Sequence, residues 1–207
     1  MIRVGLDFDN TIVGYDALFC RVAEEQGLVK KGACRTKTEV RDRLRAAGRE
    51  PLWTEMQGYV YGVRMDEAAP MPGVIDALAE AEDLGIEISI VSHKTRHPFI
   101  GPPHDLHRTA EAWIARHLVR TGRPLVPAAR IHFELTKDEK LARIAAQEFA
   151  AYVDDLPEIL AAPQFPARTL AVLYDPAGAA DLPHGAVRVR DWTEILPLLR
   201  ERCRTTG

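Results

Sequence analysis

Two carboxylates, Asp7 and Asp9, stand two residues apart at the end of an apolar run, residues 2–6. Side chains two apart on a strand share a face, so we expect both to project where the strand ends. In open α/β sheets, ligands bind at the carboxyl ends of the strands. Two carboxylates this close repel each other unless a cation or a shared proton offsets the charge. The alternative is a strand that runs into an Asx turn, with Asn10 and Thr11 capping the next segment.

Three further polar groups stand at the ends of predicted strands or at the start of a predicted helix: Ser92, Lys137 and the pair Asp154-Asp155. Singly, each has an ordinary interpretation, as a turn hydroxyl, a solvated lysine and a helix N-cap. Together they supply what phosphoryl transfer requires, namely a nucleophile, a proton carrier, a divalent cation and donors to phosphate oxygens. The acids could hold Mg²⁺, which takes oxygen ligands, and the hydroxyl and ammonium could hold phosphate.

Two lysines compete for the role of phosphate donor, because Lys137 and Lys140 lie one helical turn apart. Thr136-Lys137-Asp138-Glu139 matches a capping box, so Lys137 is predicted to be the first helical residue, beside unsatisfied amides and the positive end of the helix dipole. Lys140 precedes Leu141 and is expected to flank the buried face. The pattern favours Lys137.

The elements that must position these groups alternate along the chain. Apolar runs predict strands at residues 2–6, 86–91, 131–133, 150–153 and 170–173, with an edge strand at Val187. Helical periodicity predicts helices from Val74 to Gly85, from Leu106 to Gly122, after Thr136, around residues 159–160 and from Trp192 to Leu199. Strands alternating with helices indicate a parallel sheet doubly wound by helices, an α/β fold.

Residues 14–72 interrupt this alternation. Helical spacing predicts one helix ended by Gly27, a second ended by Gly48 and a third near residues 53–63. The segment is too long for a simple connection, and we interpret it as a helical cap. Its basic and aromatic residues are candidates for substrate contact, although solvation and packing explain them equally well: Lys30, Lys31, Arg35, Trp53, Tyr59, Tyr61 and Arg64.

Composition narrows the function classes. The 207 residues carry a net charge of −3, which offers no footprint for nucleic acid or a membrane surface. No apolar run is long enough to cross a bilayer, and the N-terminus does not resemble a signal peptide. Cys20, Cys34 and Cys203 are widely spaced, and we interpret them as reduced thiols of a cytoplasmic protein. Nothing in the sequence indicates the oligomeric state.

Asp7-Phe8-Asp9-Asn10-Thr11, Ser92, Lys137 and Asp154-Asp155 resemble, in this order, the four motifs of the haloacid dehalogenase superfamily. The resemblance covers roughly residues 2–13 and 70–176. It implies a Rossmann-like core domain of residues 1–13 and 73–207 with a cap of residues 14–72.

The resemblance also implies roles. Asp7 would attack phosphorus and form an aspartyl phosphate, and Asp9 would protonate the leaving oxygen and then activate water. Mg²⁺ would be held by Asp7, the backbone carbonyl of Asp9 and the acidic pair, with Asp155 favoured as the direct ligand and Asp154 acting through water. The phosphate-binding set would be Thr11, Ser92, His93 and Lys137.

In the superfamily, the residue two positions after the nucleophile differs between activities. Dehalogenases lack an acid at this position and transport ATPases carry Thr, whereas this sequence has Asp9. The resemblance therefore implies a phosphatase acting on a small phosphomonoester, with a phosphomutase or a non-catalytic binding protein on the same fold as alternatives. A signalling receiver domain is excluded by motif order, since there the acidic pair precedes the lysine.

Overall fold

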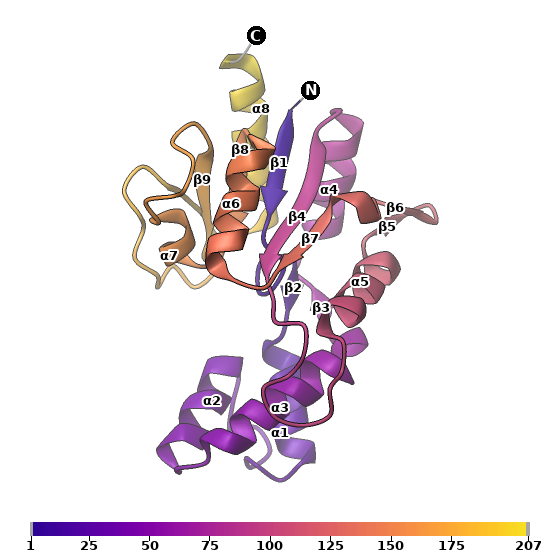
Figure 1. The fold of residues 1–207 in the computed structure, drawn as a ribbon, viewed down its shortest axis with the longest axis vertical. Helices are drawn as coiled ribbons and strands as arrows, with labels where there is room; N and C mark the ends of the chain where they lie inside the picture. The colour runs from indigo at the N-terminus through magenta and orange to yellow at the C-terminus, as the bar shows by residue number, and fades with distance from the viewer. Residues whose placement is uncertain (1, 206–207) are drawn as a thin grey trace.

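A six-stranded sheet in which every pairing is parallel forms the centre of the molecule. This computed structural model describes residues 2–205, with side chains up to residue 200. Across the sheet the strands are β10 (Val187–Val189), β9 (Leu170–Tyr174), β8 (Ala151–Asp154), β1 (Arg3–Leu6), β4 (Glu87–His93) and β7 (Ile131–Glu134). The predicted parallel α/β sheet is confirmed (Figure 1).

The central strand β1 lies between β4 and β8, with Leu6 in register with Ile90 on one side and Val153 on the other. Gly5 allows large rings to pack here, since a Cβ on it would lie 2.6 Å from atoms of both Phe149 and Tyr152. The residues after Leu6 therefore emerge at the carboxyl edge of the sheet, between two other strand ends.

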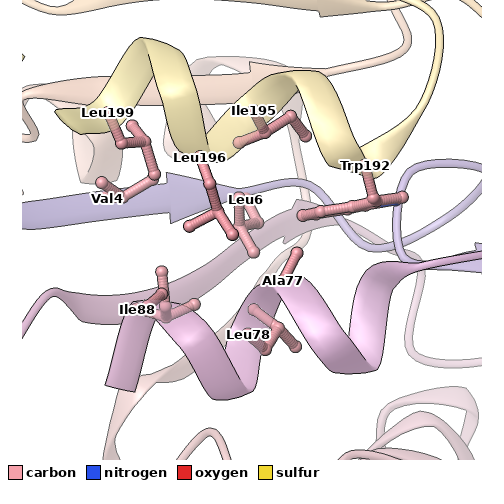
Figure 2. Close-up of a pocket in the computed structure, with 10 residues that line it drawn as sticks. Val4, Leu6, Ala77, Leu78, Ile88, Trp192, Ile195, Leu196 and Leu199 are labelled. Carbon is pink, nitrogen blue, oxygen red and sulfur yellow. The ribbon is translucent and has the colours of Figure 1, made fainter. Parts of the chain in front are cut away.

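Helices cover both faces of the sheet. On one face α4 (Val74–Asp83) and α8 (Ile195–Thr205) pack on β1 and β4, and Figure 2 shows their apolar side chains meeting Val4, Leu6 and Ile88. The void left between them is only about 10 Å³ and is lined by apolar side chains. A space of that size without polar partners holds no ordered water, so this contact is core packing and not a binding site.

The opposite face carries α6 (Lys137–Gln147) and the single-turn helix α7 (Pro157–Leu160). Leu141 and Ile144 of α6 pack with Val91 and Tyr152 in a second apolar cluster. The two layers of helices bury the sheet on both sides, which explains the near-continuous apolar strands.

The segment after β1 leaves the sheet through β2 (Val13–Gly14) and returns through β3 (Ala69–Pro70), and these two strands pair antiparallel. Between them lie the three predicted helices and a short 3-10 turn: α1 (Asp16–Glu25), α2 (Lys37–Ala46), α3 (Glu50–Gly62) and η1 (Met65–Glu67). Figure 1 places them beyond the carboxyl ends of the sheet strands. The division into core and cap domains stays a prediction.

The loop between β4 and α5 (Leu106–His117) runs alongside α3 before it leads into α5 (Figure 1). It packs on two glycines of that helix. A Cβ on Gly58 would lie 2.7 Å from Cβ of Pro98, and one on Gly62 would lie 2.6 Å from Cβ of His104. Close contact of this loop with α3 therefore depends on glycine at both positions.

The predicted helix from Leu106 to Gly122 is too long. It ends at His117, and β5 (Val119–Arg120) and β6 (Arg123–Pro124) then form a hairpin. Thr121 and Gly122, the two residues between these strands, have φ of 48° and 78°. Positive φ at both positions is what a two-residue type I′ hairpin turn requires, so Gly122 marks a turn and not a helix end.

The remaining short elements are the 3-10 turns η2 (Ala128–Arg130) and η3 (Trp192–Glu194), the latter leading into α8. Within residues 2–205, no helix combines the length and the apolar character needed to cross a membrane. Cys20 and Cys34 are buried, and the side chain of Cys203 lies outside the described residues.

Candidate active site

Asp7 comes directly after the last residue of β1 and is buried at the carboxyl edge of the sheet. Its backbone N–H donates to the carbonyl of Val153 at 2.8 Å, which extends the pairing with β8 by one residue. Ser92, near the end of β4, donates from Oγ to Oδ1 of Asp7 at 2.8 Å. The fold thus brings Asp7 and Ser92 into contact, while their chemical roles stay predictions.

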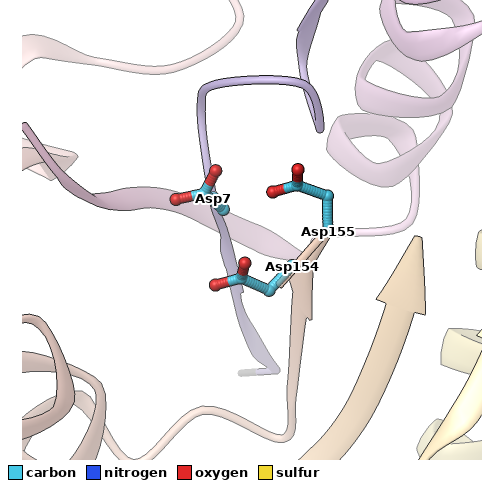
Figure 3. Close-up of side chains that lie close together, drawn as sticks. All are labelled: Asp7, Asp154 and Asp155. Carbon is cyan, nitrogen blue, oxygen red and sulfur yellow. The ribbon is translucent and has the colours of Figure 1, made fainter. Parts of the chain in front are cut away.

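Asp154 and Asp155 lie at the end of the other neighbouring strand, β8, and face Asp7 (Figure 3). One carboxylate oxygen from each of the three residues lies within 4.8 Å of the others. Asp7 is far from the adjacent pair Asp154 and Asp155 in the sequence, and the parallel strands β1 and β8 bring them together because their carboxyl ends share one edge.

Lys140 compensates part of this negative charge. Its Nζ donates to Oδ1 of Asp7 and to Oδ2 of Asp154, each at 2.6 Å, and all three side chains are buried. Although burial acts to lower it, the pKa of Lys140 is raised by the charges of Asp7 and Asp154, so its ammonium stays protonated. A buried ammonium bridging two carboxylates is held in one orientation.

The prediction that Lys137 reaches the site is wrong in its geometry. Lys137 does begin α6 after the predicted capping box, but its Nζ pairs with Glu158 at 2.9 Å, and both of these side chains are about half exposed. Side chains on a helix point back toward its N-terminus. A lysine one turn inside, Lys140, therefore reaches the helix mouth, whereas one at the first position extends beyond it.

Asp9 has charged and polar partners of its own, which the sequence did not reveal. Both of its carboxylate oxygens accept from Nζ of the buried Lys94, at 2.9 and 2.8 Å, and Oδ1 also accepts from the hydroxyl of Tyr15 at 2.5 Å. Burial acts to raise the pKa of Asp9, but Lys94 and Tyr15 lower it below its ordinary value. Its side chain is not part of the three-acid cluster.

Burial and the neighbouring negative charges both raise the pKa values of Asp7 and Asp155. Burial raises the pKa of Asp7 to about 7 against the pull of Lys140, with Asp154 and Asp9 adding to the rise. Burial, followed by the charges of Asp7 and Asp154, raises the pKa of Asp155 to about 8. One ammonium therefore does not neutralise the cluster, which is the condition in which a further cation stabilises it.

The donor set fits Mg²⁺, since it consists of carboxylate oxygens alone. Both oxygens of Asp154 already accept hydrogen bonds, Oδ2 from Lys140 and Oδ1 from the backbone N–H of Leu156 at 2.9 Å. Asp155 accepts only a long bond, 3.4 Å, from Asn10 among the described residues. This asymmetry is compatible with Asp155 as a direct ligand and Asp154 as an indirect one.

Two predicted phosphate-binding residues, Thr11 and His93, make no hydrogen bond to the acid cluster among the described residues. Thr11 is fully buried; its carbonyl accepts from the indole N–H of Trp192 at 3.1 Å, while its hydroxyl lacks a partner among the described residues. Nε2 of His93 lies 3.0 Å from the carbonyl oxygen of Leu135, so this ring is directed at the loop before α6. A phosphate-binding role for either residue stays a prediction.

An open cavity of about 770 Å³ adjoins the acid cluster. Asn10 and Asp155 line it on the sheet side, and Lys37, Arg41 and Trp53 line it on the side of the inserted helices. Its volume suits a small organic molecule. A ligand in this cavity would contact Asp155 of the acid cluster on one side and basic side chains on the other.

The residues that sequence reasoning missed are Lys94 and Tyr15. Lys94 stands two residues after Ser92, and the same spacing rule that paired Asp7 with Asp9 would have placed both side chains on one face. No comparable signal marked Tyr15, because its contact with Asp9 arises from the turn after β1. In that turn Asn10 adopts a positive φ of 59°, which asparagine tolerates better than most residues.

Comparison with known proteins identifies the fold. No protein-family model matches the chain, and no curated protein matches it. A haloacid dehalogenase-like hydrolase of Streptococcus pneumoniae superposes with a TM-score of 0.63 and 15% identity, covering 96% of this chain and 98% of that one. For a β-phosphoglucomutase of Pyrococcus, the TM-score is 0.59 and the identity 14%, over 99% and 100% of the two chains.

A HAD-superfamily hydrolase of Ehrlichia chaffeensis gives a TM-score of 0.56 at 11% identity, covering 97% of each chain. An L-2-haloacid dehalogenase also has this fold. Since these proteins include hydrolases, a mutase and a dehalogenase, the shared fold leaves the activity to the chemistry of the site.

Proposed function

We propose that this chain, which has the fold of the haloacid dehalogenase superfamily, is a Mg²⁺-dependent phosphatase that hydrolyses a small phosphomonoester through Asp7. The observation that carries the proposal is the separate charge compensation of two carboxylates. Lys140 and Ser92 hold Asp7, whereas Lys94 and Tyr15 hold Asp9. A nucleophile must be ionised and a general acid must be protonated. Without bound ligands the pKa directions are the opposite, raised for Asp7 and lowered for Asp9, so these roles require Mg²⁺ beside Asp7 and the substrate phosphate beside Lys94.

In the first step an oxygen of Asp7 attacks phosphorus, and the bond from phosphorus to the ester oxygen breaks. Lys140 and Ser92 both contact Oδ1 of Asp7, which fixes the carboxylate and leaves Oδ2 available for attack. The third N–H of the Lys140 ammonium would donate to a phosphate oxygen, and the single O–H of Ser92 would turn from Asp7 to the phosphate. Mg²⁺ held by Asp7, Asp155 and, through water, Asp154 would neutralise charge between the nucleophile and the phosphate.

Asp9 carries the proton in both steps. It protonates the departing oxygen of the alcohol, and it then removes a proton from the water that attacks the aspartyl phosphate and regenerates Asp7. Because Lys94 and Tyr15 favour the ionised form of Asp9, the acid step requires the incoming phosphate to draw Lys94 away or to share its charge. The base step needs no such change.

The test is release of inorganic phosphate from a panel of phosphomonoesters in millimolar Mg²⁺, compared with Asp7→Asn protein. We expect turnover that chelation by EDTA abolishes and that Asp7→Asn lacks while it keeps a wild-type circular dichroism spectrum. Undiminished phosphate release by Asp7→Asn would reject the assignment of the nucleophile.

A phosphomutase is the second candidate, favoured by the fold shared with the Pyrococcus mutase. In that reaction the phosphoryl group on Asp7 passes to a second hydroxyl instead of water. Incubation with glucose 1-phosphate and a trace of glucose 1,6-bisphosphate distinguishes the two. Glucose 6-phosphate without free phosphate would indicate a mutase, and free phosphate would indicate hydrolysis.

A further inference from the structure

Four side chains form a lysine–tyrosine cluster beside Asp9: Tyr15, Lys37, Tyr61 and Lys94. Nζ of Lys94 lies 4.7 Å from the centre of the Tyr61 ring, and the rings of Tyr15 and Tyr61 meet edge to face with centres 5.0 Å apart. Nζ of Lys37 donates to the hydroxyl of Tyr61 at 2.6 Å. The cluster links the acidic edge of the sheet to α2 and α3.

The two lysines of the cluster differ in their charge partners. Lys94 is neutralised by both oxygens of Asp9. Among the residues with described side chains, no carboxylate lies within 4 Å of Nζ of Lys37, whose hydrogen-bond acceptor is a phenol. Three aromatic rings surround its Nζ, with centres at 5.7 Å for Tyr15 and 5.4 Å for Phe19 and Tyr61. An ammonium has three donors, so Lys37 retains donors and charge for an anion.

The backbone of Lys37 is fixed. It is the first residue of α2, whose N-cap Thr36 accepts from the backbone N–H of Glu39 at 3.1 Å. The backbone N–H of Lys37 itself donates to Oδ1 of Asp16 in α1 at 2.8 Å. With its start tied to α1 and its ammonium tied to α3, Lys37 is held in place by two neighbouring helices.

Lys37 lines the same cavity as Asp155 of the acid cluster. Lys37 and Arg41, one turn later on α2, line it opposite Asn10 and Asp155. Although burial acts to lower it, the pKa of Lys37 is raised by Tyr61 and by the negative charges of Asp9 and Asp155. A molecule whose phosphate lay at Asp7 would therefore have cationic side chains further along the cavity.

We propose that Lys37 binds a second anionic group of the substrate, a carboxylate or a second phosphate, and thereby selects acidic phosphomonoesters over neutral ones. This rests on the proposed phosphatase function. In the proposed reaction Ser92 and Lys140 serve as donors to the transferred phosphate. That phosphate therefore does not need Lys37, a partly buried cation on the other side of the cavity. Arg41 contributes less, because its guanidinium pairs with Asp42 at 2.8 Å.

The experiment compares matched pairs of phosphomonoesters that differ in one acidic group. 3-Phosphoglycerate against glycerol 3-phosphate tests a carboxylate, and glucose 1,6-bisphosphate against glucose 1-phosphate tests a second phosphate. We expect the wild-type kcat/KM to favour the acidic member of at least one pair by about tenfold or more, the range for a hydrogen bond to a charged group. Lys37→Met keeps the aliphatic stem and should reduce that ratio by about tenfold.

Arg43→Met is the matched control, since Arg43 is an exposed cation of α2, the helix that begins with Lys37, and it should leave the ratio unchanged. A wild-type enzyme without preference in either pair would overturn the proposal. So would Lys37→Met lowering kcat/KM equally for both members of a pair, because Lys37 would then serve the transferred phosphate or the fold.

Binding separates this proposal from the proposed function. Calorimetric titration of Asp7→Asn protein with 3-phosphoglycerate, glycerol 3-phosphate and the two glucose phosphates repeats the comparison without turnover. One outcome is that Asp7→Asn binds an acidic member, Asp7→Asn/Lys37→Met does not, and the wild type shows no turnover. That outcome would reject the phosphatase function and support the anion site. Turnover by wild type without any Lys37-dependent binding would reject the anion site alone.

Discussion

Nζ of Lys140 lies 2.6 Å from Oδ1 of Asp7, although 133 residues separate them in the sequence. The same ammonium contacts Asp154 at 2.6 Å. Lys140→Ala removes a preorganised donor and should lower kcat/KM by about 10²–10³-fold. It also leaves two buried carboxylates without their cation, which should cost about 3–5 kcal/mol of unfolding free energy.

Lys137→Ala is the control for this variant, because Lys137 lies on the same helix and pairs with the solvent-exposed Glu158. Exposed ion pairs contribute little, so both rate and stability should stay within about twofold and about 1 kcal/mol of wild type. The measurements are kcat/KM below the melting temperature of each variant and urea unfolding. The reverse order of damage would transfer the role to Lys137.

The lysine pair shows where sequence reasoning succeeds and fails. The capping box at Thr136 and Glu139 is a local pattern, and it predicted the start of α6 correctly. Which lysine reaches Asp7 depends on the direction of helical side chains and on the position of α6 over the sheet. The buried side of the helix carries Lys140, Leu141 and Ile144. Lys140, which is next to a core leucine, therefore points toward the sheet and reaches Asp7.

The fold, like the start of α6, was predictable because its elements are encoded by local sequence patterns. Apolar runs and helical spacing predicted all six strands of the sheet and the three inserted helices, because each depends on local burial, and the resemblance to the haloacid dehalogenase superfamily is confirmed for the fold. The hairpin at Thr121 and Gly122 was missed because its signal is two positive φ angles. The contact of Lys94 with Asp9 joins residues 85 positions apart. The spacing from Ser92 could have placed Lys94 at the edge of the sheet, but no local pattern identifies Asp9 as its partner.

The pair formed by Asp9 and Lys94 predicts a measurable coupling. Lys94 is buried, and its ammonium contacts both oxygens of Asp9. Asp9→Asn and Lys94→Met each leave one charged partner behind, whereas the double variant removes both charges. A double-mutant cycle measured by urea unfolding should therefore give a coupling energy of about 1–3 kcal/mol.

Arg21 and Glu67 offer a comparison pair, since they lie 2.6 Å apart with side chains 48% and 42% exposed. Water screens such a pair, so its coupling should stay below about 1 kcal/mol. Equal coupling in the two cycles would mean that burial adds nothing to the contact between Asp9 and Lys94. That result would weaken the argument that Asp9 is held in a separate electrostatic environment.

Metal-free protein should lose stability as pH rises. Burial and the charges of Asp7 and Asp154 raise the pKa of Asp155 to about 8, from an ordinary value of 3.8. The folded protein thus holds a proton that the unfolded chain releases near its ordinary pKa. The stabilisation by this bound proton is complete below the pKa of Asp155 in the unfolded chain. It falls progressively as pH rises toward the pKa of Asp155 in the folded protein. Melting temperatures in EDTA across this range check the sign, with Asp155→Asn expected to flatten the decline.

Saturating Mg²⁺ should reverse this loss, because the cation binds the folded acid cluster and not the dispersed carboxylates of the unfolded chain. At a concentration about 100-fold above Kd, the stabilisation is about 2.7 kcal/mol, or about 5–10 °C in melting temperature for a chain of this size. Scanning fluorimetry in MgCl₂ and in EDTA measures the shift. An unchanged shift in Asp155→Asn would remove this residue from the ligand set.

Gly58 should resist replacement by alanine even though it lies within α3. Alanine at an exposed helical position is better than glycine by about 1 kcal/mol. At Gly58, however, a Cβ would lie 2.7 Å from Cβ of Pro98 and 3.0 Å from the carbonyl oxygen of Ile100. The loop after β4 would have to shift as a whole, at a cost of about 1–3 kcal/mol.

Gly58→Ala is therefore expected to lower the free energy of unfolding. Glu55→Ala is the control, because Glu55 is exposed one turn earlier on α3, and its free energy of unfolding should stay within about 0.5 kcal/mol of wild type. Urea unfolding of both variants measures the difference. Because the displaced loop begins at Lys94, the partner of Asp9, Gly58→Ala should also lower kcat at temperatures where the protein stays folded. A Gly58→Ala protein that is more stable than wild type and equally active would show that the loop does not depend on its contact with α3.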